Sequence, residues 1–462
     1  MGNQGSQGFP QVKSLNAFDV LKPNTWGVKL FDPKEEKALQ AKISLGEKIF
    51  FNLDNTPEKE LGVERFRVNR FEDAAKYFRS SLKAKQNDPE SLIYMNNASA
   101  AAAGNPIVIA IVVPIGSNVN VAKETLRGVA QYQHMINQQG GIRGRRLQVL
   151  IANDEDDPNV AENLATKLSQ NPRIAAVVGH ESSQAGLAAA RIYNQQGVVM
   201  LSSSGYAREL TKMGKFIFRT TPNSRVIADQ LAQQASHDIP NARVTLCHNS
   251  QALDSRSFRD DFVAAIHAEG GTITHTACDF AASDFNPHEI PSQAVRDGAT
   301  TLVLAPALKN LNQAIAVMQA NQGRLEMLAS HSMYTFDTLQ KGRISASDMT
   351  LSVPWDASQV QSKTYAQTAT RLWKGLGTWR TAMAYDATKV IVQGLIASTN
   401  RQGLQRALAN PGFSTQGATG QISFLPTGDR KGQAVLVRIL PGQRSGTGFD
   451  FMAFQTQDSS RP

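Results

Sequence analysis

The chain has 462 residues, enough for two to four domains, and its 41% hydrophobic and 19% charged content is that of an ordinary globular protein. No run approaches the roughly 18 consecutive apolar residues of a membrane-spanning helix, and the first residues lack the pattern of a signal peptide. The net charge of +9 raises the question of nucleic-acid binding. Lysine and arginine are scattered, however, without a basic stripe that carries aromatic residues, so we expect no nucleic-acid partner.

The two cysteines, Cys247 and Cys278, both fall in predicted strands. They are too few and too far apart in sequence for a metal cluster. Two alternatives remain: buried thiols, which we favour slightly, or one disulfide in an oxidising compartment. The acidic string Asp154–Asp157 lacks the spacing of a calcium loop and is interpreted as a solvated loop. We therefore expect no metal site and no cofactor.

The first hundred residues divide into two segments. Residues 1–56 lack periodicity and predict a flexible segment with one short helix over Pro33–Ile43. Residues 57–104 predict helices over Glu58–Val68 and Phe71–Lys85, a third helix from Pro89, and a linker over Ser99–Gly104. The helical spacing resembles a single tetratricopeptide repeat. Because one repeat cannot bury its own face, we expect this unit to lean on the main domain or on a partner protein.

From Ile107 onward, strands alternate with helices, which is the pattern of an α/β fold with parallel sheets. The alternation restarts near Asn223, and two serial units of similar size predict two lobes. The predicted strands are Ile107–Pro114, Leu147–Ala152, Ile174–Val178, Val198–Leu201, Arg243–His248, Gly271–Asp279, Thr300–Ala305, Leu325–Ala329, Thr350–Pro354 and Ala434–Ile439.

The stretch from Ile174 to Thr211 carries hydroxyl groups after two successive strands. Ser182 and Ser183 precede a predicted helix, and Ser202–Ser204 follow the next strand. Ligands of open parallel sheets bind at the carboxyl ends of the strands. The N–H groups and dipole of a helix start suit an anion such as a carboxylate. Ordinary helix caps and turns remain the alternative interpretation of these serines.

Seven strings, in this order, resemble one family, the periplasmic solute-binding proteins of the branched-chain amino-acid and amide type. The strings are INQQGGIRGRRLQ (Ile136–Gln148), NDEDDP (Asn153–Pro158), VVGHESS (Val177–Ser183), ELT (Glu209–Thr211), FRTTP (Phe218–Pro222), AYDA (Ala384–Ala387) and GATGQISFLPTGD (Gly417–Asp429). The helical preface with DPESLIYMNNA (Asp88–Ala98) is similar to the cyanobacterial branch of this family.

The resemblance implies two doubly wound parallel-sheet lobes of the type I bilobal fold, preceded by the small helical unit. One lobe would comprise residues 105–222 with 356–417, and the other residues 223–355 with 418–455. The crossovers would lie near Thr220–Asn223, Pro354–Ala357 and Gly417–Gly420. Ligand would bind between the lobes, which close by hinge motion. Its carboxylate would meet the serine loop, and its ammonium would meet an acid and carbonyl groups.

Carried over residue by residue, the resemblance fits the first lobe in part. Ser183 falls on the carboxylate-binding serine of the family, next to Ser182. Ser204 and Gly205 fall on the second loop of the cleft. Tyr206, however, stands where a threonine usually contacts both ends of an amino acid.

The second lobe departs further from the family pattern. Leu253 stands where an aromatic lid is common, and around His331 the family acid for the ammonium is missing. Glu181 and Asp254 are the substitute acids that the chain offers. Since an unpaired buried ammonium is costly, three alternatives remain. The ligand is not an α-amino acid, a substitute acid serves, or the cleft is degenerate.

The sequence therefore predicts a solute-binding protein that captures a small polar ligand and presents it to the permease of an ATP-binding-cassette importer. The alternative is a sensory or scaffold module in which lobe closure signals through the N-terminal helical unit to a protein partner. No catalytic constellation is present, so we do not expect an enzyme. The family implies a periplasmic or membrane-anchored location on the extracytoplasmic side, with the export segment absent from this chain.

Overall fold

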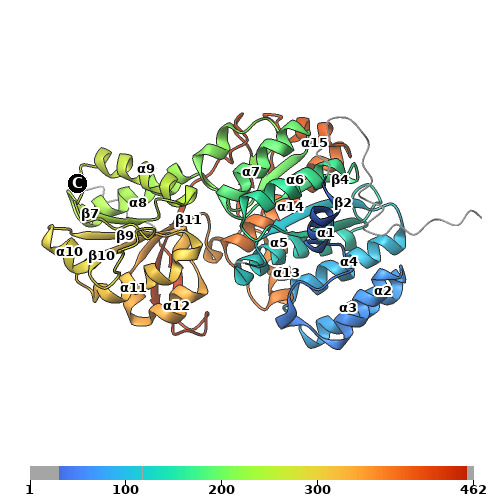
Figure 1. Cartoon of the computed structure of the whole chain (residues 1–462), viewed down its shortest axis with the longest axis horizontal. Helices are drawn as coiled ribbons and strands as arrows, with labels where there is room; N and C mark the ends of the chain where they lie inside the picture. The colour runs from blue at the N-terminus through green and yellow to red at the C-terminus, as the bar shows by residue number, and fades with distance from the viewer. Residues whose placement is uncertain (1–30, 117, 455–462) are drawn as a thin grey trace, which may run out of the picture.

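The computed structural model describes residues 31–116 and 118–454, and it shows two lobes side by side, each with helices on the faces of a sheet (Figure 1). The predicted N-terminal segment falls partly outside the described residues, which begin at Phe31. From there to residue 56 the prediction of a flexible segment is wrong, apart from its helix, α1 (Pro33–Ala41). Strand β1 (Ile43–Ser44) pairs with the first sheet, and Ile43, Leu45 and Phe51 are buried in its core.

The first sheet has the order β1-β3-β2-β4-β5-β6, and its strands are parallel except for β1. Every residue of β2 and β4 is buried, which explains their continuous apolar runs. Its strands are β2 (Ile107–Val113), β3 (Leu147–Asn153), β4 (Ile174–Val178), β5 (Val199–Ser202) and β6 (Ile217–Arg219).

Two pairs of helices flank this sheet. Helices α5 and α14 pack together, as do α6 and α7. Gly128 of α5 allows the first of these close approaches, because a Cβ there would lie 2.1 Å from the carbonyl oxygen of Thr381. The helices of this lobe are α5 (Val119–Gln138), α6 (Pro158–Gln170), α7 (Ser183–Gln195), α13 (Lys363–Trp373), α14 (Trp379–Ala397) and α15 (Arg401–Leu408).

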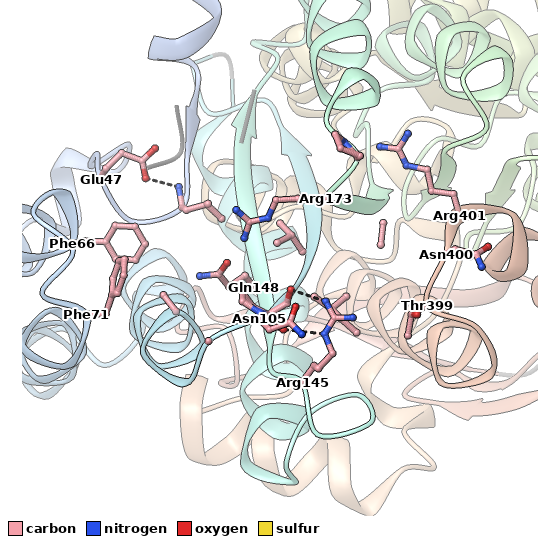
Figure 2. A pocket seen from close by; sticks show the side chains of 18 of the residues that line it. Glu47, Phe66, Phe71, Asn105, Arg145, Gln148, Arg173, Thr399, Asn400 and Arg401 are labelled. Carbon is pink, nitrogen blue, oxygen red and sulfur yellow. Dashed lines mark hydrogen bonds between the residues drawn. The ribbon is translucent and has the colours of Figure 1, made fainter. Parts of the chain in front are cut away.

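The N-terminal helices α2 (Pro57–Arg67), α3 (Phe71–Ala84) and α4 (Pro89–Ala103) pack on the first lobe through α4, which contacts α5 and β3. The expectation that this unit leans on the main domain is confirmed. The predicted linker over Ser99–Gly104 is wrong, because the alanine-rich stretch continues α4 up to Gly104. Phe66 and Phe71 line one end of a large hollow at the amino ends of the strands of the first sheet (Figure 2).

The second sheet has the order β15-β14-β11-β10-β9-β7-β8. Its strands are parallel from β8 to β11, whereas β14 and β15 add antiparallel pairs at the edge. The predicted strand Gly271–Asp279 is shorter than expected. The strands are β7 (Arg243–His248), β8 (Thr272–Ile273), β9 (Thr301–Ala305), β10 (Glu326–Ser330), β11 (Thr350–Val353), β14 (Val435–Pro441) and β15 (Phe449–Ala453).

Helices α8 and α9 cover one face of this sheet, and α10, α11 and α12 are grouped elsewhere around it (Figure 1). Their bounds are α8 (Ser224–Asp238), α9 (Leu253–Ala268), α10 (Ile290–Arg296), α11 (Leu311–Asn321) and α12 (Phe336–Gly342). In both sheets the parallel strands follow the order second, first, third, fourth, fifth. The connections that follow the first and third strands run toward opposite edges of the sheet, so a crevice forms at the carboxyl ends of these two strands.

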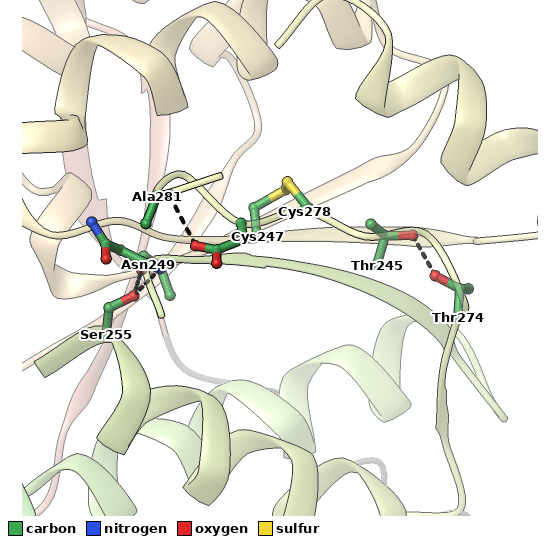
Figure 3. The surroundings of a disulfide bond; sticks show 9 residues. Thr245, Cys247, Asn249, Ser255, Thr274, Cys278 and Ala281 are labelled. Carbon is green, nitrogen blue, oxygen red and sulfur yellow. Dashed lines mark hydrogen bonds between the residues drawn. A yellow bond between two sulfur atoms is a disulfide. The ribbon is translucent and has the colours of Figure 1, made fainter. Parts of the chain in front are cut away.

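The two cysteines form a disulfide, Cys247–Cys278, so the slight preference for free thiols is wrong (Figure 3). The physical reason lies in the pairing of strand β7. His248 forms a parallel bridge with Asp279, which places the preceding residues next to each other with their Cα atoms 4.5 Å apart. Pairing between segments distant in sequence could not be read from the cysteine spacing.

Three segments pass between the lobes. The first follows β6 near Thr220, and the second follows β11 before α13. The third lies later than expected, because residues 418–430 still contact the first lobe. Gly428 accepts a hydrogen bond from the Arg219 N–H through its carbonyl, and Arg430 donates to the Thr220 carbonyl. A short hairpin of β12 (Thr415–Gly417) and β13 (Gly420–Ile422) precedes this passage.

In the described part of the chain, no helix combines the length and the apolar character needed to cross a membrane.

Candidate functional site

A cavity of about 160 Å³ lies between the lobes, at the carboxyl ends of strands from both sheets. The first lobe contributes the loops after β4 and β5 and the start of α14. The second lobe contributes the loops after β7, β9 and β10. Seven of the predicted site residues line this cavity: Glu181, Ser182, Ser204, Tyr206, Leu253, Asp254 and His331.

The other two predicted residues, Ser183 and Gly205, do not line the cavity. Ser183 is buried, and its hydroxyl accepts a hydrogen bond of 3.0 Å from the Ala207 N–H. The N–H of Gly205 donates to the Ser202 hydroxyl. Ser183 therefore lies behind the cavity wall, where its hydroxyl oxygen accepts from the turn after β5 and its side chain also interacts with Asp254.

The start of helix α7 does bind an anionic group, and this group is a side chain of the protein itself. The Ser183 N–H donates to Oδ2 of Asp254 across the cleft at 3.1 Å. Ser182 caps the helix by accepting from the Ala185 N–H. A carboxylate from the second lobe thus occupies the position that the sequence assigned to a ligand carboxylate.

Two carboxyl groups of the cavity wall each leave one buried oxygen without a partner among the described residues. Oε1 of Glu181 accepts from the Thr125 hydroxyl at 2.7 Å, whereas Oε2 has no partner. Oδ1 of Asp254 likewise has no hydrogen-bond partner among the described residues. Burial raises the pKa of Glu181 to about 7 and that of Asp254 to about 6, because both charged forms lose solvation.

The cavity lining also includes three rings in edge contact and one guanidinium group. His331 makes edge contacts with Tyr206 and Trp379, at centroid distances of 4.0 and 5.3 Å. Burial, together with the charge of Arg380, lowers the pKa of His331 to about 3, so the imidazole is neutral near pH 7. Arg380 lies over the Trp379 ring and 3.9 Å from the Glu124 carboxylate.

Trp379 and Arg380 were missed by the sequence analysis. They begin helix α14, which enters the first lobe after the second crossover, about 200 residues beyond the serine loops. Neither residue belongs to the seven strings. A buried Trp-Arg pair at a helix start is a weak signal by itself, since only the fold brings it to the cleft.

A second hollow, of about 1470 Å³, lies at the amino ends of the first sheet (Figure 2). Its lining includes several cations, but Arg145 and Arg401 donate to backbone carbonyl groups. None of the predicted site residues lines it. Because ligands of such sheets bind at the carboxyl ends, the cleft between the lobes is the candidate site.

A leucine-, isoleucine-, valine-, threonine- and alanine-binding protein of Pseudomonas aeruginosa is 36% identical over 125 residues, which are 27% of this chain and 33% of that protein. A Leu/Ile/Val-binding protein of Escherichia coli K12 is 32% identical over the same length. The chain spans about a third of the length of these curated relatives.

Among solved structures, the substrate-binding protein of an ATP-binding-cassette transporter from Desulfitobacterium hafniense, in complex with Leu, superposes with a TM-score of 0.63. The match covers 75% of this chain and 100% of that chain at 22% identity, and it shows the fold. The family model of the periplasmic binding proteins matches residues 106–441, which is most of the chain. This chain therefore belongs to the periplasmic binding protein family.

Proposed function

We propose that this protein captures a small polar solute between its two lobes, outside the cytoplasm, and delivers it to an ATP-binding-cassette importer. The solute is an amino acid, an amide or a related carboxylate. One observation carries the proposal: the cavity between the lobes is enclosed by polar groups from both of them, and several of these buried groups lack a partner within the described residues. Unpaired buried polar groups are costly unless a ligand or water satisfies them.

The proposed site comprises the seven predicted residues that line the cavity, together with Trp379 and Arg380. Its volume of about 160 Å³ is below the range of roughly 300–1,000 Å³ found for drug-sized ligands, which favours a small solute. We keep the predicted division into lobes, with the third crossover moved from Gly417–Gly420 to a point beyond Arg430.

Thermal unfolding in the presence of amino acids, amides, urea and small carboxylates tests the proposed function. A solute at 100 times its dissociation constant stabilises the protein by about 2.7 kcal/mol. Tyr206→Ala should reduce the shift, because the ring forms part of the cavity wall. Arg225→Ala is the control, since Arg225 pairs with Asp229 on the surface of α8. The absence of a shift from every class would remove this function.

A sensory role is the second candidate, and helix α5 favours it. Its Thr125 donates to Glu181 in the cleft, whereas Arg127 donates to Asn87 beside the N-terminal helical unit at 2.8 Å. Lys123 of the same helix pairs with Asp54. A change at Glu181 could thus reach the helical unit and a protein partner bound there. Hydrogen exchange over residues 57–104 should slow on solute binding if this is so, and unchanged exchange would remove the sensory role.

A further inference from the structure

The Ser183 N–H at the start of helix α7 already binds a carboxylate of the protein itself. Asp254 accepts the Ser183 N–H there, and it reaches this position from helix α9 of the other lobe. A second carboxylate at the same N–H group would meet the Asp254 charge at contact distance, in a buried site where like charges repel strongly. The favourable electrostatics of this helix start are therefore already used by the protein.

The buried cavity atoms that lack partners among the described residues show what a ligand must supply. Glu181 Oε2 and Asp254 Oδ1 are acceptors and require hydrogen-bond donors. Trp379 Nε1 is a donor and requires an acceptor, and His331 Nδ1 is also unpaired. A solute that satisfies these atoms must carry both N–H groups and an oxygen acceptor.

The charges around the cavity agree with this polarity. Among the residues that line the cavity, the inner cation is Arg380, which interacts electrostatically with Glu181 and already has the Glu124 carboxylate at 3.9 Å. At the exposed rim, Asp156 and Lys309 oppose each other. Other charged or titratable neighbours are the neutral His331, the Tyr206 hydroxyl, Asp154 near Glu181, and both Glu209 and the buried Arg219 near Asp254. The wall formed by Glu181 and Asp254 is thus negative, and a cation fits it best.

We propose that the solute carries a protonated amine, and that this end binds to Glu181 and Asp254 at the start of α7. Its oxygen acceptor faces Trp379 and Arg380. This orientation is the reverse of the one that the family resemblance implies for the ligand carboxylate. The inference rests on the proposed function, because it names the solute class and the polarity of that same site.

Proton release follows from this orientation. Burial raises the pKa of Glu181 to about 7 and of Asp254 to about 6, whereas a bound ammonium favours both ionised carboxylates. A primary amine, with a pKa of about 10, stays protonated throughout. Amine binding should therefore release protons near pH 6–7, and affinity should rise between about pH 5 and pH 8.

Two matched sets of solutes test the proposal by calorimetry. Each set contains an amino acid, the amine without its carboxylate and the acid without its amine: leucine, 3-methylbutylamine and 4-methylpentanoate, and alanine, ethylamine and propionate. In at least one set the amine should bind at least about tenfold more tightly than the acid. Heats measured in two buffers of different ionisation enthalpy should show proton release from the unmodified protein.

Variants separate the two carboxylates from the rest of the site. Asp254→Asn and Glu181→Gln should each weaken amine binding by at least about tenfold, since each keeps the shape and removes the charge. Asp229→Asn is the matched control, because Asp229 lies on the surface of the same lobe and pairs with Arg225 within helix α8. It should leave amine affinity unchanged.

Three results would overturn the proposed orientation. The first is that the acids bind and the amines do not. The second is that neither amine binds. The third is that Asp254→Asn strengthens the binding of the acids. The last result would mean that Asp254 only blocks a conventional carboxylate site. These failures differ from failure of the proposed function, in which no solute of any class in the broader thermal screen stabilises the protein.

Discussion

Single residues of the cleft depart from their ordinary chemistry because the fold removes them from water. Glu181 is 7% exposed, and its carboxyl group accepts from Thr125 while its other oxygen stays unpaired among the described residues. Burial is the largest cause of its raised pKa, and the hydrogen bonds and Arg380 oppose it. Glu181 is therefore partly protonated near neutral pH.

Glu181→Gln should remove a pH-dependent loss of stability. The pKa of Glu181 is raised from 4.5 to about 7 in the folded protein, so its contribution is fully present below about pH 4.5 and is lost as the pH rises through 7. At pH 8 the free energy of unfolding of the glutamine variant should exceed that of the wild type by up to about 3 kcal/mol, since one pKa unit corresponds to about 1.4 kcal/mol. Urea unfolding at about pH 4.5 and at pH 8 measures this difference. Equal pH dependence of the two proteins would contradict it.

At the scale of elements, one buried ion cluster joins the N-terminal helices. Nζ of Lys59 on α2 lies 2.8 Å from Asp88 and 2.7 Å from Glu90, at the start of α4. The Glu90 carboxylate also accepts from the N–H groups of Phe50 and Phe51. All three charged side chains are almost completely buried, so each depends on the others for its charge to be paired.

Lys59→Met should destabilise the helical unit by about 3–5 kcal/mol, because it leaves two buried carboxylates without their cation. Urea unfolding and limited proteolysis within residues 57–104 are the measurements. Arg70→Ala is the control, since it removes an exposed pair with Asp73 and should cost less than about 1 kcal/mol. If both variants unfold alike, the cluster does not hold the unit.

For the whole molecule, contacts outside the cavity hold the two lobes together. Arg208 lies 3.4 Å from both Asp260 and Asp261, and the Ser257 hydroxyl donates to Glu209 at 2.9 Å. Each of these contacts joins the segment after β5 to helix α9. They favour the closed arrangement without touching a solute in the cavity.

The double variant Arg208→Ala with Glu209→Ala should populate an open arrangement. Its radius of gyration in small-angle scattering should increase without solute, and the apparent affinity should fall by the fraction of molecules that remain closed. Arg225→Ala, which removes a pair within α8, should have neither effect. An unchanged radius would show that these contacts do not govern closure.

Local patterns determined much of the fold. The strands Ile174–Val178 and Arg243–His248 were predicted with the bounds that the structure has. The alternation of helices with these strands was also predicted, because burial of one face of a long helix such as α5 imposes a period on the sequence. The edge strand β15 was missed, since a short antiparallel strand at a sheet edge owes its conformation to its neighbour.

The sequence by itself determined that two α/β lobes exist and that serine loops follow strands β4 and β5, since apolar periodicity and chain order set those features. Only the tertiary structure decided how these groups are used. It brought Asp254 to the Ser183 N–H, joined Cys247 to Cys278 and placed Arg380 in the cleft. The Ser183–Asp254 and Cys247–Cys278 pairings join residues at least 31 positions apart, where contact depends on how the elements pack and not on local spacing.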